Sequence, residues 1–163
     1  MTTWAASLTA KDVMTGAPVC VQPSATIRQL ARLFNEHEIS GAPVVDPQGR
    51  LIGMVSKTDL IRRCAEGIVE VPPAYMYELI SEHRGEELEL VPEPLVCVDD
   101  FMTADPATVS PETPIGEVAR LMFERRIHRV VVTDRDQIPV GIITSLDLLG
   151  ACRGARVVGS TPR

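Results

Sequence analysis

The sequence predicts an α+β fold made of two copies of one β-α-β-β-α unit. Three observations predict it: an internal repeat without gaps, short apolar runs next to helical patterns, and helix-start signals at matching places in both copies. The chain has 163 residues, of which 45 % are hydrophobic and 23 % are charged. That length suits one ordinary globular domain or two small ones that share a core.

The repeat becomes visible when the sequence is shifted by 88 residues. No gap is needed from residue 12 to residue 64 of the first copy. We expect copies at residues 8–66 and 98–154, joined by a linker at residues 67–97. Each copy is small for an independent core, so the two should bury their apolar faces against each other. The matched pairs include Asp12/Asp100, Met14/Met102, Thr15/Thr103, Ile39/Ile127, Gly53/Gly141, Asp59/Asp147 and Cys64/Cys152.

A short helical turn is expected at the start of the first copy. Thr9 and Asp12 have the spacing of a capping box, and Leu8 and Val13 are placed as a hydrophobic staple. A brief strand is expected next, at residues 19–21.

An amphipathic helix should follow that strand. Thr26 and Gln29 form a second capping box, and the apolar residues after it recur at helical spacing. One face of this helix is therefore expected to be buried. That face consists of Ile27, Leu30, Ala31 and Phe34.

A hairpin and a second helix complete the copy. Residues 42–45 are too apolar for a surface strand, and residues 46–49 have the proline and glycine of a tight turn. A second strand is expected at 51–55, with a helix from Ser56. The second copy repeats the pattern at residues 107–109, 115–123, 130–132 and 140–143 and from Thr144 onward.

The linker is strongly acidic. Residues 66–100 carry a net charge of −9, whereas the rest of the chain carries +3. A solvated linker is the favoured interpretation, and a flap or a partner surface is the alternative. An amphipathic helix facing the body of the protein or a second subunit is also expected, because four apolar residues share a helical face: Tyr75, Met76, Leu79 and Ile80.

Composition excludes several classes of function. The net charge of −6 argues against nucleic-acid binding, and 4 % aromatic residues provide few platforms for stacking bases. The apolar runs are too short to span a membrane. The cysteines show no C-x-x-C pair, which favours free thiols and a cytoplasmic location. No phosphate-binding loop, dinucleotide fingerprint or H-E-x-x-H motif occurs, so an enzyme is not expected and neither a metal nor a required cofactor is predicted.

Two S/T-x-x-D boxes remain as candidates for chemistry. One runs from Ser56 to Asp59 and the other from Thr144 to Asp147, and each follows a glycine-containing apolar strand. Such a box is an ordinary helix cap. The same residues can also bind a nucleotide, because the helix start attracts phosphate and a carboxylate can accept hydrogen bonds from a ribose diol. The sequence alone leaves both interpretations open.

With these boxes, the repeated M-T-x-x-P, V-V-x-D and [IV]-[ST]-x-x-D-L motifs resemble the CBS domain, named after cystathionine β-synthase. Two copies in tandem look like a Bateman module, similar to the repeats of the regulatory subunit of AMP-activated protein kinase. This resemblance implies a pseudo-two-fold arrangement with two clefts, each built crosswise from both copies.

The resemblance also implies the residues of each cleft. In the first, Asp147 would bind the ribose, Thr144 would lie on the phosphate side, and Arg129 would bind phosphate. We expect this cleft to be competent and the reciprocal one to be weaker or empty, because the first copy has the uncharged Ser40 and Gly41 at the positions equivalent to His128 and Arg129. The other residues of the first cleft would be Ile142, His128, Thr15, Cys20, Ile39, Ser40 and Ala42. The second, weaker cleft would contain Asp59, Ser56, Thr103, Thr108, Ile127 and Val130.

The leading hypothesis is a non-catalytic sensor that binds an adenine nucleotide between the repeats. AMP, ADP and ATP are the candidate ligands, and S-adenosylmethionine is a less favoured one. A homodimer and an unidentified protein partner are also expected. The alternative is an oligomerisation or docking module that needs no ligand, in which both S/T-x-x-D boxes are caps.

Overall fold

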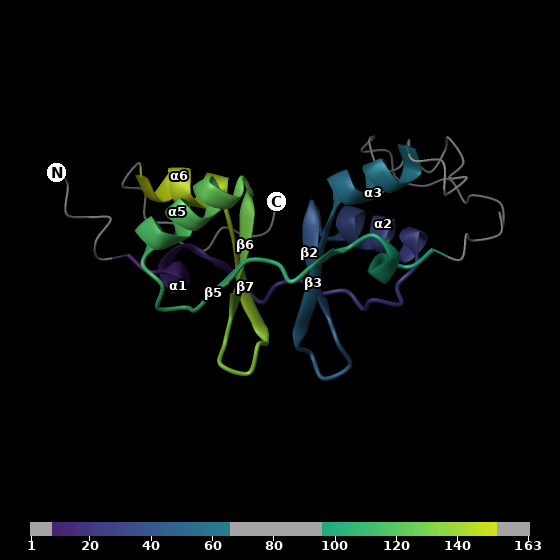
Figure 1. Ribbon diagram of the computed structural model, residues 1–163, viewed down its shortest axis with the longest axis horizontal. Helices are drawn as coiled ribbons and strands as arrows, with labels where there is room; N and C mark the ends of the chain where they lie inside the picture. Colours follow the sequence, from purple (N-terminus) through teal and green to yellow (C-terminus); the bar gives the residue numbers. More distant parts are fainter. Residues whose placement is uncertain (1–7, 66–95, 153–163) are drawn as a thin grey trace.

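The computed structural model describes residues 8–65 and 96–152. Two antiparallel hairpins stand side by side in the middle of the molecule, and the longer helices lie on its outer sides (Figure 1). The first copy contains α1 (Ala10–Val13), β1 (Thr15–Gly16), α2 (Ile27–Glu36), β2 (Gly41–Val45), β3 (Leu51–Ser56) and α3 (Lys57–Ala65). The second contains the 3-10 helix η1 (Val98–Asp100), β4 (Thr103–Ala104), β5 (Thr108–Val109), α5 (Ile115–Arg125), β6 (Arg129–Thr133), β7 (Pro139–Thr144) and α6 (Ser145–Cys152).

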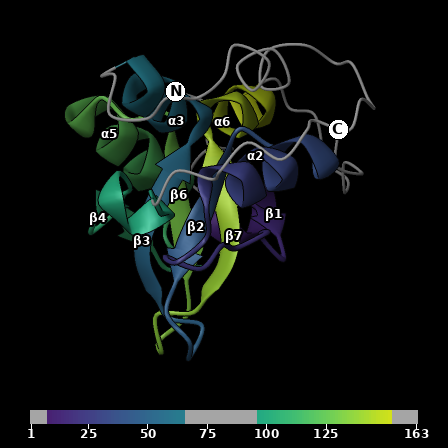
Figure 2. The same ribbon diagram turned by 90° about the vertical axis from the view of Figure 1, so that its right-hand side faces the viewer.

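Each sheet takes an edge strand from the other copy. The strand order is β1-β7-β6-β5 in one sheet and β2-β3-β4 in the other. Strand β1 of the first copy pairs with β7, and β4 of the second copy pairs with β3, both antiparallel. The helices gather at one end and the hairpin turns project from the other (Figure 2). The two copies are therefore interleaved.

The hydrophobic cores are exchanged in the same way. Ala10 and Val13 of α1 pack with Ile115, Val118 and Met122 of α5, in the core of the second copy. Reciprocally, Val98, Phe101 and Met102 pack against the core formed by α2 and the β2–β3 hairpin. Neither core is complete without the opening segment of the other copy.

The repeated glycines explain how these opening segments fit. A Cβ atom on Gly53 would collide with the Met102 side chain, and one on Gly141 would collide with Met14. Each methionine thus lies across a strand of the other copy at the place where that strand has no side chain. The repeated methionine of each copy therefore packs against the repeated glycine of the other copy.

The backbone repeats as faithfully as the sequence does. Ala17 and Asp105, which occupy equivalent positions, both have φ of 48°. Glu38 and Arg126 form a second such pair, with φ of 52° and 53°. Non-glycine residues adopt this left-handed conformation at a cost of about 1–2 kcal/mol. Its recurrence at matched positions shows that both copies make the same local turns.

Most predicted elements are confirmed. Helix α1 has the Thr9–Asp12 box, and α2 begins at the Thr26–Gln29 box with all four predicted apolar residues buried. The turn after β2 is closed by a hydrogen bond from Gly49 N–H to the Asp46 carbonyl, with N···O of 2.9 Å. Both hairpins and the helices after them also occur where they were expected.

The predicted strand at residues 19–21 is wrong. Only an isolated bridge between Val21 and Val44 occurs there. The strand of this region is instead β1, which the sequence did not predict because its partner, β7, belongs to the other copy. The expected linker helix around Tyr75 lies outside the described residues.

Candidate functional site

The two S/T-x-x-D boxes have the same geometry. At the start of α3, the backbone N–H and the hydroxyl of Ser56 both donate to Oδ2 of Asp59, at 2.8 and 2.6 Å. At the start of α6, the same two groups of Thr144 donate to Oδ2 of Asp147, both at 2.7 Å. The amide of each aspartate donates back to the hydroxyl oxygen at 3.3 Å. Both boxes are therefore helix caps.

This geometry limits what each box can offer a ligand. A hydroxyl has one proton, and in both boxes that proton is donated to the aspartate. Neither Ser56 nor Thr144 can donate to a phosphate in this arrangement. The second carboxylate oxygen, Oδ1, makes no hydrogen bond within either box. Each aspartate thus keeps one acceptor for a donor such as a ribose hydroxyl.

Each box is also tied to the strand that lies beside it. The N–H of Lys57 donates to the carbonyl of Ser40, and the N–H of Ser145 donates to the carbonyl of His128, both at 3.0 Å. These bonds connect the first residue of each helix to the residue before β2 or β6. The positions next to Gly41 and Arg129 are therefore fixed close to the two boxes.

Arg129 reaches from the second copy into the first. Its Nη2 donates to Oγ of Ser40 at 3.2 Å, and its guanidinium occupies the space that a side chain on Gly41 would fill. Burial lowers the pKa of Arg129, and the negative charge of Asp59 opposes this effect. The sequence grouped Arg129 with Asp147. The structure places its guanidinium against Ser40 and Gly41, on the side of Asp59.

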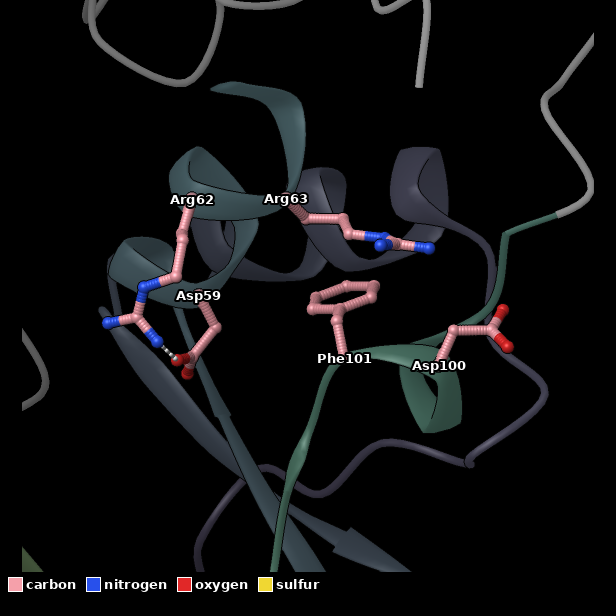
Figure 3. Close-up of a pocket in the computed structure, with 5 residues that line it drawn as sticks. All are labelled: Asp59, Arg62, Arg63, Asp100 and Phe101. Carbon is pink, nitrogen blue, oxygen red and sulfur yellow. Dashed lines mark ion pairs between the residues drawn. The ribbon is translucent and has the colours of Figure 1, made fainter. Parts of the chain in front are cut away.

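A pocket of about 190 Å³ opens next to Asp59. Both copies line it, since Asp59, Arg62 and Arg63 belong to α3, whereas Asp100 and Phe101 belong to the start of the second copy. Figure 3 shows the Phe101 ring between Asp59 and Asp100, with Arg63 above it. Nη1 of Arg62 lies 3.9 Å from Oδ1 of Asp59. The pocket is smaller than the roughly 300–1,000 Å³ typical of small-molecule sites, so it could enclose only part of a nucleotide.

The crosswise arrangement brings several predicted residues together. Thr15 is paired with Ile142, two residues before Thr144. Thr103 is paired with Met54, two residues before Ser56. Each exposed threonine thus comes from one copy and lies beside the box of the other.

Other predicted residues lie in less accessible places. Strand alternation directs Ala42 and Val130 to the helix-facing sides of their sheets, where they are 0 % and 1 % exposed. Both belong to the hydrophobic cores, so we leave them out of the proposed site. Ile39 and Ile127 are partly buried and pack against these same cores.

Three other predicted site residues, Cys20, Thr108 and His128, belong to neither of the capping boxes. The thiol of Cys20 donates to the carbonyl of Pro18 at 3.4 Å, and burial raises its pKa, so it is a poor nucleophile. Thr108 is exposed at the start of β5, and the side chain of His128 is also exposed.

The sequence prediction did not include Arg62 and Arg63, and it considered Gly41 only as the uncharged counterpart of Arg129. Gly41 accommodates Arg129, and both arginines line the pocket. The repeat offered a signal, because the positions equivalent to these three are Arg129, Gly150 and Ala151. Extending the comparison of charge at equivalent positions to α3 and α6 would have identified Arg62 and Arg63.

The described part of the chain contains neither a cluster of metal ligands nor a membrane-spanning helix. Within residues 8–65 and 96–152, no three His, Cys, Asp or Glu side chains are grouped as a metal site would require. In the same ranges, no helix has the length and apolar character needed to cross a bilayer.

A family model for the CBS domain matches residues 10–66 and 98–154. The chain belongs to the CBS domain family. It is 29 % identical over 156 residues to an uncharacterized protein of Methanocaldococcus jannaschii, covering 86 % of this chain and 89 % of the relative. It is also 29 % identical over 138 residues to the chloroplastic CBS domain-containing protein CBSX1 of Arabidopsis thaliana. That match covers 76 % of this chain, which spans only 54 % of CBSX1.

Solved CBS domain pairs share the fold. The pair of protein MJ0100, in complex with 5′-methylthioadenosine and S-adenosyl-L-methionine, superimposes with a TM-score of 0.71 at 22 % identity. It covers 90 % of this chain and 97 % of its own. CBSX2 of Arabidopsis thaliana, in complex with AMP, gives a TM-score of 0.68 at 25 % identity and covers 91 % and 98 % of the two chains. The predicted tandem CBS fold is thus confirmed.

Proposed function

We propose that this protein is a non-catalytic regulatory module that binds an adenine nucleotide in the clefts between its two CBS repeats. The observation that carries the proposal is the pair of matched carboxylates, Asp59 and Asp147. Each is held by a helix cap through Oδ2, and neither Oδ1 accepts a hydrogen bond within its box, although Oδ1 of Asp59 lies 3.9 Å from Nη1 of Arg62. A ribose diol supplies the donors that such an oxygen accepts.

The phosphate of the ligand is proposed to bind on the Asp59 side. Arg129 provides a partly buried guanidinium there, and the planar guanidinium can make paired hydrogen bonds to phosphate oxygens. Arg62 adds a second positive charge, at 3.9 Å from Asp59. This proposal moves the phosphate from the Asp147 cleft, where the sequence placed it, to the Asp59 cleft. Asp147 keeps its proposed role at the ribose of the other cleft.

Similarity to CBSX2, whose structure holds AMP, supports an adenine nucleotide as the ligand. AMP is therefore the first candidate, followed by ADP and ATP, and S-adenosylmethionine stays the less favoured one. Binding would hold the repeats together, because the pocket at Asp59 is lined by both copies and Thr15 of the first copy lies beside the Asp147 box. A ligand at 100 times its dissociation constant adds about 2.7 kcal/mol of stability.

Titration calorimetry and thermal unfolding with AMP, ADP, ATP and S-adenosylmethionine test the proposal. At least one compound should bind and raise the melting temperature, and the double variant Asp59→Ala/Asp147→Ala should lose this effect. The exposed variant Asp136→Ala is the matched control and should bind like the wild type. No shift with any compound at millimolar concentration, or full binding by the double variant, would contradict the proposal.

A homodimer is the second part of the proposal. The helices of the second copy expose three large apolar side chains: Phe123 is 85 % exposed, Leu146 77 % and Leu149 62 %. The first copy has the polar Asn35 and Thr58 at two of the equivalent positions, and Ile61, which is 42 % exposed, at the third. Apolar side chains gathered on neighbouring helices favour a protein interface.

Gel filtration with light scattering tests the dimer. The wild type should elute as a dimer at micromolar concentration, and Phe123→Arg should shift it toward the monomer. Asn35→Arg, at the equivalent position of the first copy, is the control. A monomeric wild type would contradict the dimer and would support a surface for a different protein partner. The cytoplasmic location expected from the sequence stays a prediction.

A further inference from the structure

We infer that the two clefts accept adenine compounds of different charge. The cleft at Asp59 takes a nucleotide with its phosphate, whereas the cleft at Asp147 takes an uncharged nucleoside such as adenosine. This inference rests on the proposed function and assigns a ligand class to each cleft.

The two capped helices differ in charge. Helix α3 carries Lys57, Arg62 and Arg63, and the equivalent residues of α6 are Ser145, Gly150 and Ala151. A Cβ atom on Gly150 would have no heavy atom within 4 Å. The region that corresponds to Arg62 is therefore open in the second copy. Where α3 presents a guanidinium close to its aspartate, α6 presents no side chain.

Arg129 crosses from the second copy to the first, and the residue at the equivalent position of the first copy does not cross to the second. Its guanidinium leaves the second copy and lies over Gly41, close enough to Ser40 for a hydrogen bond. The pseudo-symmetric partner of Arg129 is Gly41, which has no side chain to send back. A side chain at this position could reach the other copy from either side, but only the second copy has one there. The guanidinium of Arg129 therefore adds a positive charge next to the Asp59 box, and no equivalent side chain adds one next to the Asp147 box.

The two clefts should therefore respond oppositely to a phosphate. Among the described residues, Oδ1 of Asp147 has neither a hydrogen-bond nor an ion-pair partner. A phosphate entering that cleft would meet an unneutralised carboxylate, and like charges brought together without a cation repel. A nucleoside brings the same ribose diol without the charge. At Asp59 the guanidinium groups offset the carboxylate.

Adenosine and AMP, which differ only in the phosphate, separate the two clefts by calorimetry. In Asp59→Asn, AMP affinity should fall at least about tenfold while adenosine binding persists; in Asp147→Asn, adenosine binding should fall and AMP binding should persist. Asparagine keeps an oxygen for the cap, and unchanged circular dichroism would verify the fold.

A variant that adds a positive charge near Asp147 tests the same inference in the second cleft. In the Asp59→Asn background, Gly150→Arg should raise AMP affinity by about tenfold without changing adenosine affinity. Gly116→Arg is the matched control, since Gly116 also lies in a helix with no heavy atom within 4 Å of its Cβ position.

The outcomes separate the two proposals. If Asp59→Asn binds AMP as tightly as adenosine, or if Gly150→Arg leaves AMP affinity unchanged, the inference is wrong and the proposed function stands. If the wild type binds neither compound at millimolar concentration, the inference is wrong. The proposed function is wrong as well only if ADP, ATP and S-adenosylmethionine also fail to bind.

Discussion

The two capping boxes share one geometry but not one electrostatic environment. Their hydrogen bonds agree within 0.1 Å, for example 2.6 and 2.7 Å for the hydroxyl bonds to Asp59 and Asp147. Asp59 nevertheless faces Arg62 at 3.9 Å and the charge of Arg129, and α6 has no basic residue. A repeated motif thus determines the shape of a site, whereas the charge of the site depends on the residues that differ between the copies.

The largest effect is expected from the leucines that follow the two aspartates. Leu60 is fully buried, whereas Leu148 is only partly buried. Leu60→Ala should lower the free energy of unfolding by about 2–5 kcal/mol, and Leu148→Ala by less, because fewer contacts are lost. Urea unfolding of both variants measures the difference. Equal losses would mean that the two cores are equivalent at this position.

The next largest effect is expected at Gly41. A methyl group there would displace the Arg129 guanidinium, so Gly41→Ala should weaken AMP binding about tenfold, which is about 1.4 kcal/mol. Adenosine binding should not change. Gly16→Ala is the control, because its added methyl would meet only the Val140 carbonyl at 4.0 Å. Unchanged AMP affinity in Gly41→Ala, measured by calorimetry, would show that the position of Arg129 does not matter for the phosphate.

Removal of either cap should have a smaller and symmetrical effect. Without ligand, Asp59→Ala and Asp147→Ala should each lower the free energy of unfolding by about 1 kcal/mol, since each removes the same cap. Asp136→Ala should stay within about 0.5 kcal/mol of the wild type. Thermal unfolding provides the measurement. A much larger loss for one aspartate would mean that its carboxylate has an additional structural role.

The smallest effect concerns the opening helix of the first copy. Hydrogen bonds from the backbone N–H and then the hydroxyl of Thr9 hold the pKa of Asp12 below its ordinary value. Because the folded-state pKa is the lower one, Asp12 stabilises the fold above the unfolded pKa of about 3.9, and this contribution is lost as pH falls through the folded value.

Melting temperatures at pH 7 and pH 3 test this effect. Asp12→Asn should lower the melting temperature slightly at pH 7 and should be less destabilising at pH 3. An equal difference at both pH values would show that the charge of Asp12 does not contribute.

The sequence alone determined the repeat, the capped helices and the buried hairpins. Local chemistry is sufficient to predict these features: Thr26 and Gln29 have the spacing of a capping box, and residues 42–45 are too apolar for a surface strand. The S/T-x-x-D geometry is equally local, because its hydrogen bonds join residues three positions apart.

The tertiary structure alone decided how the copies are interleaved and which cleft receives the arginine. Strand β1 exists because β7 lies beside it, although Thr15 and Ile142 are far apart in the sequence. Arg129 contacts Ser40 for the same reason, across 89 positions. Contacts of this kind depend on how two surfaces meet, and capping, periodicity and turn chemistry describe only residues that are neighbours along the chain.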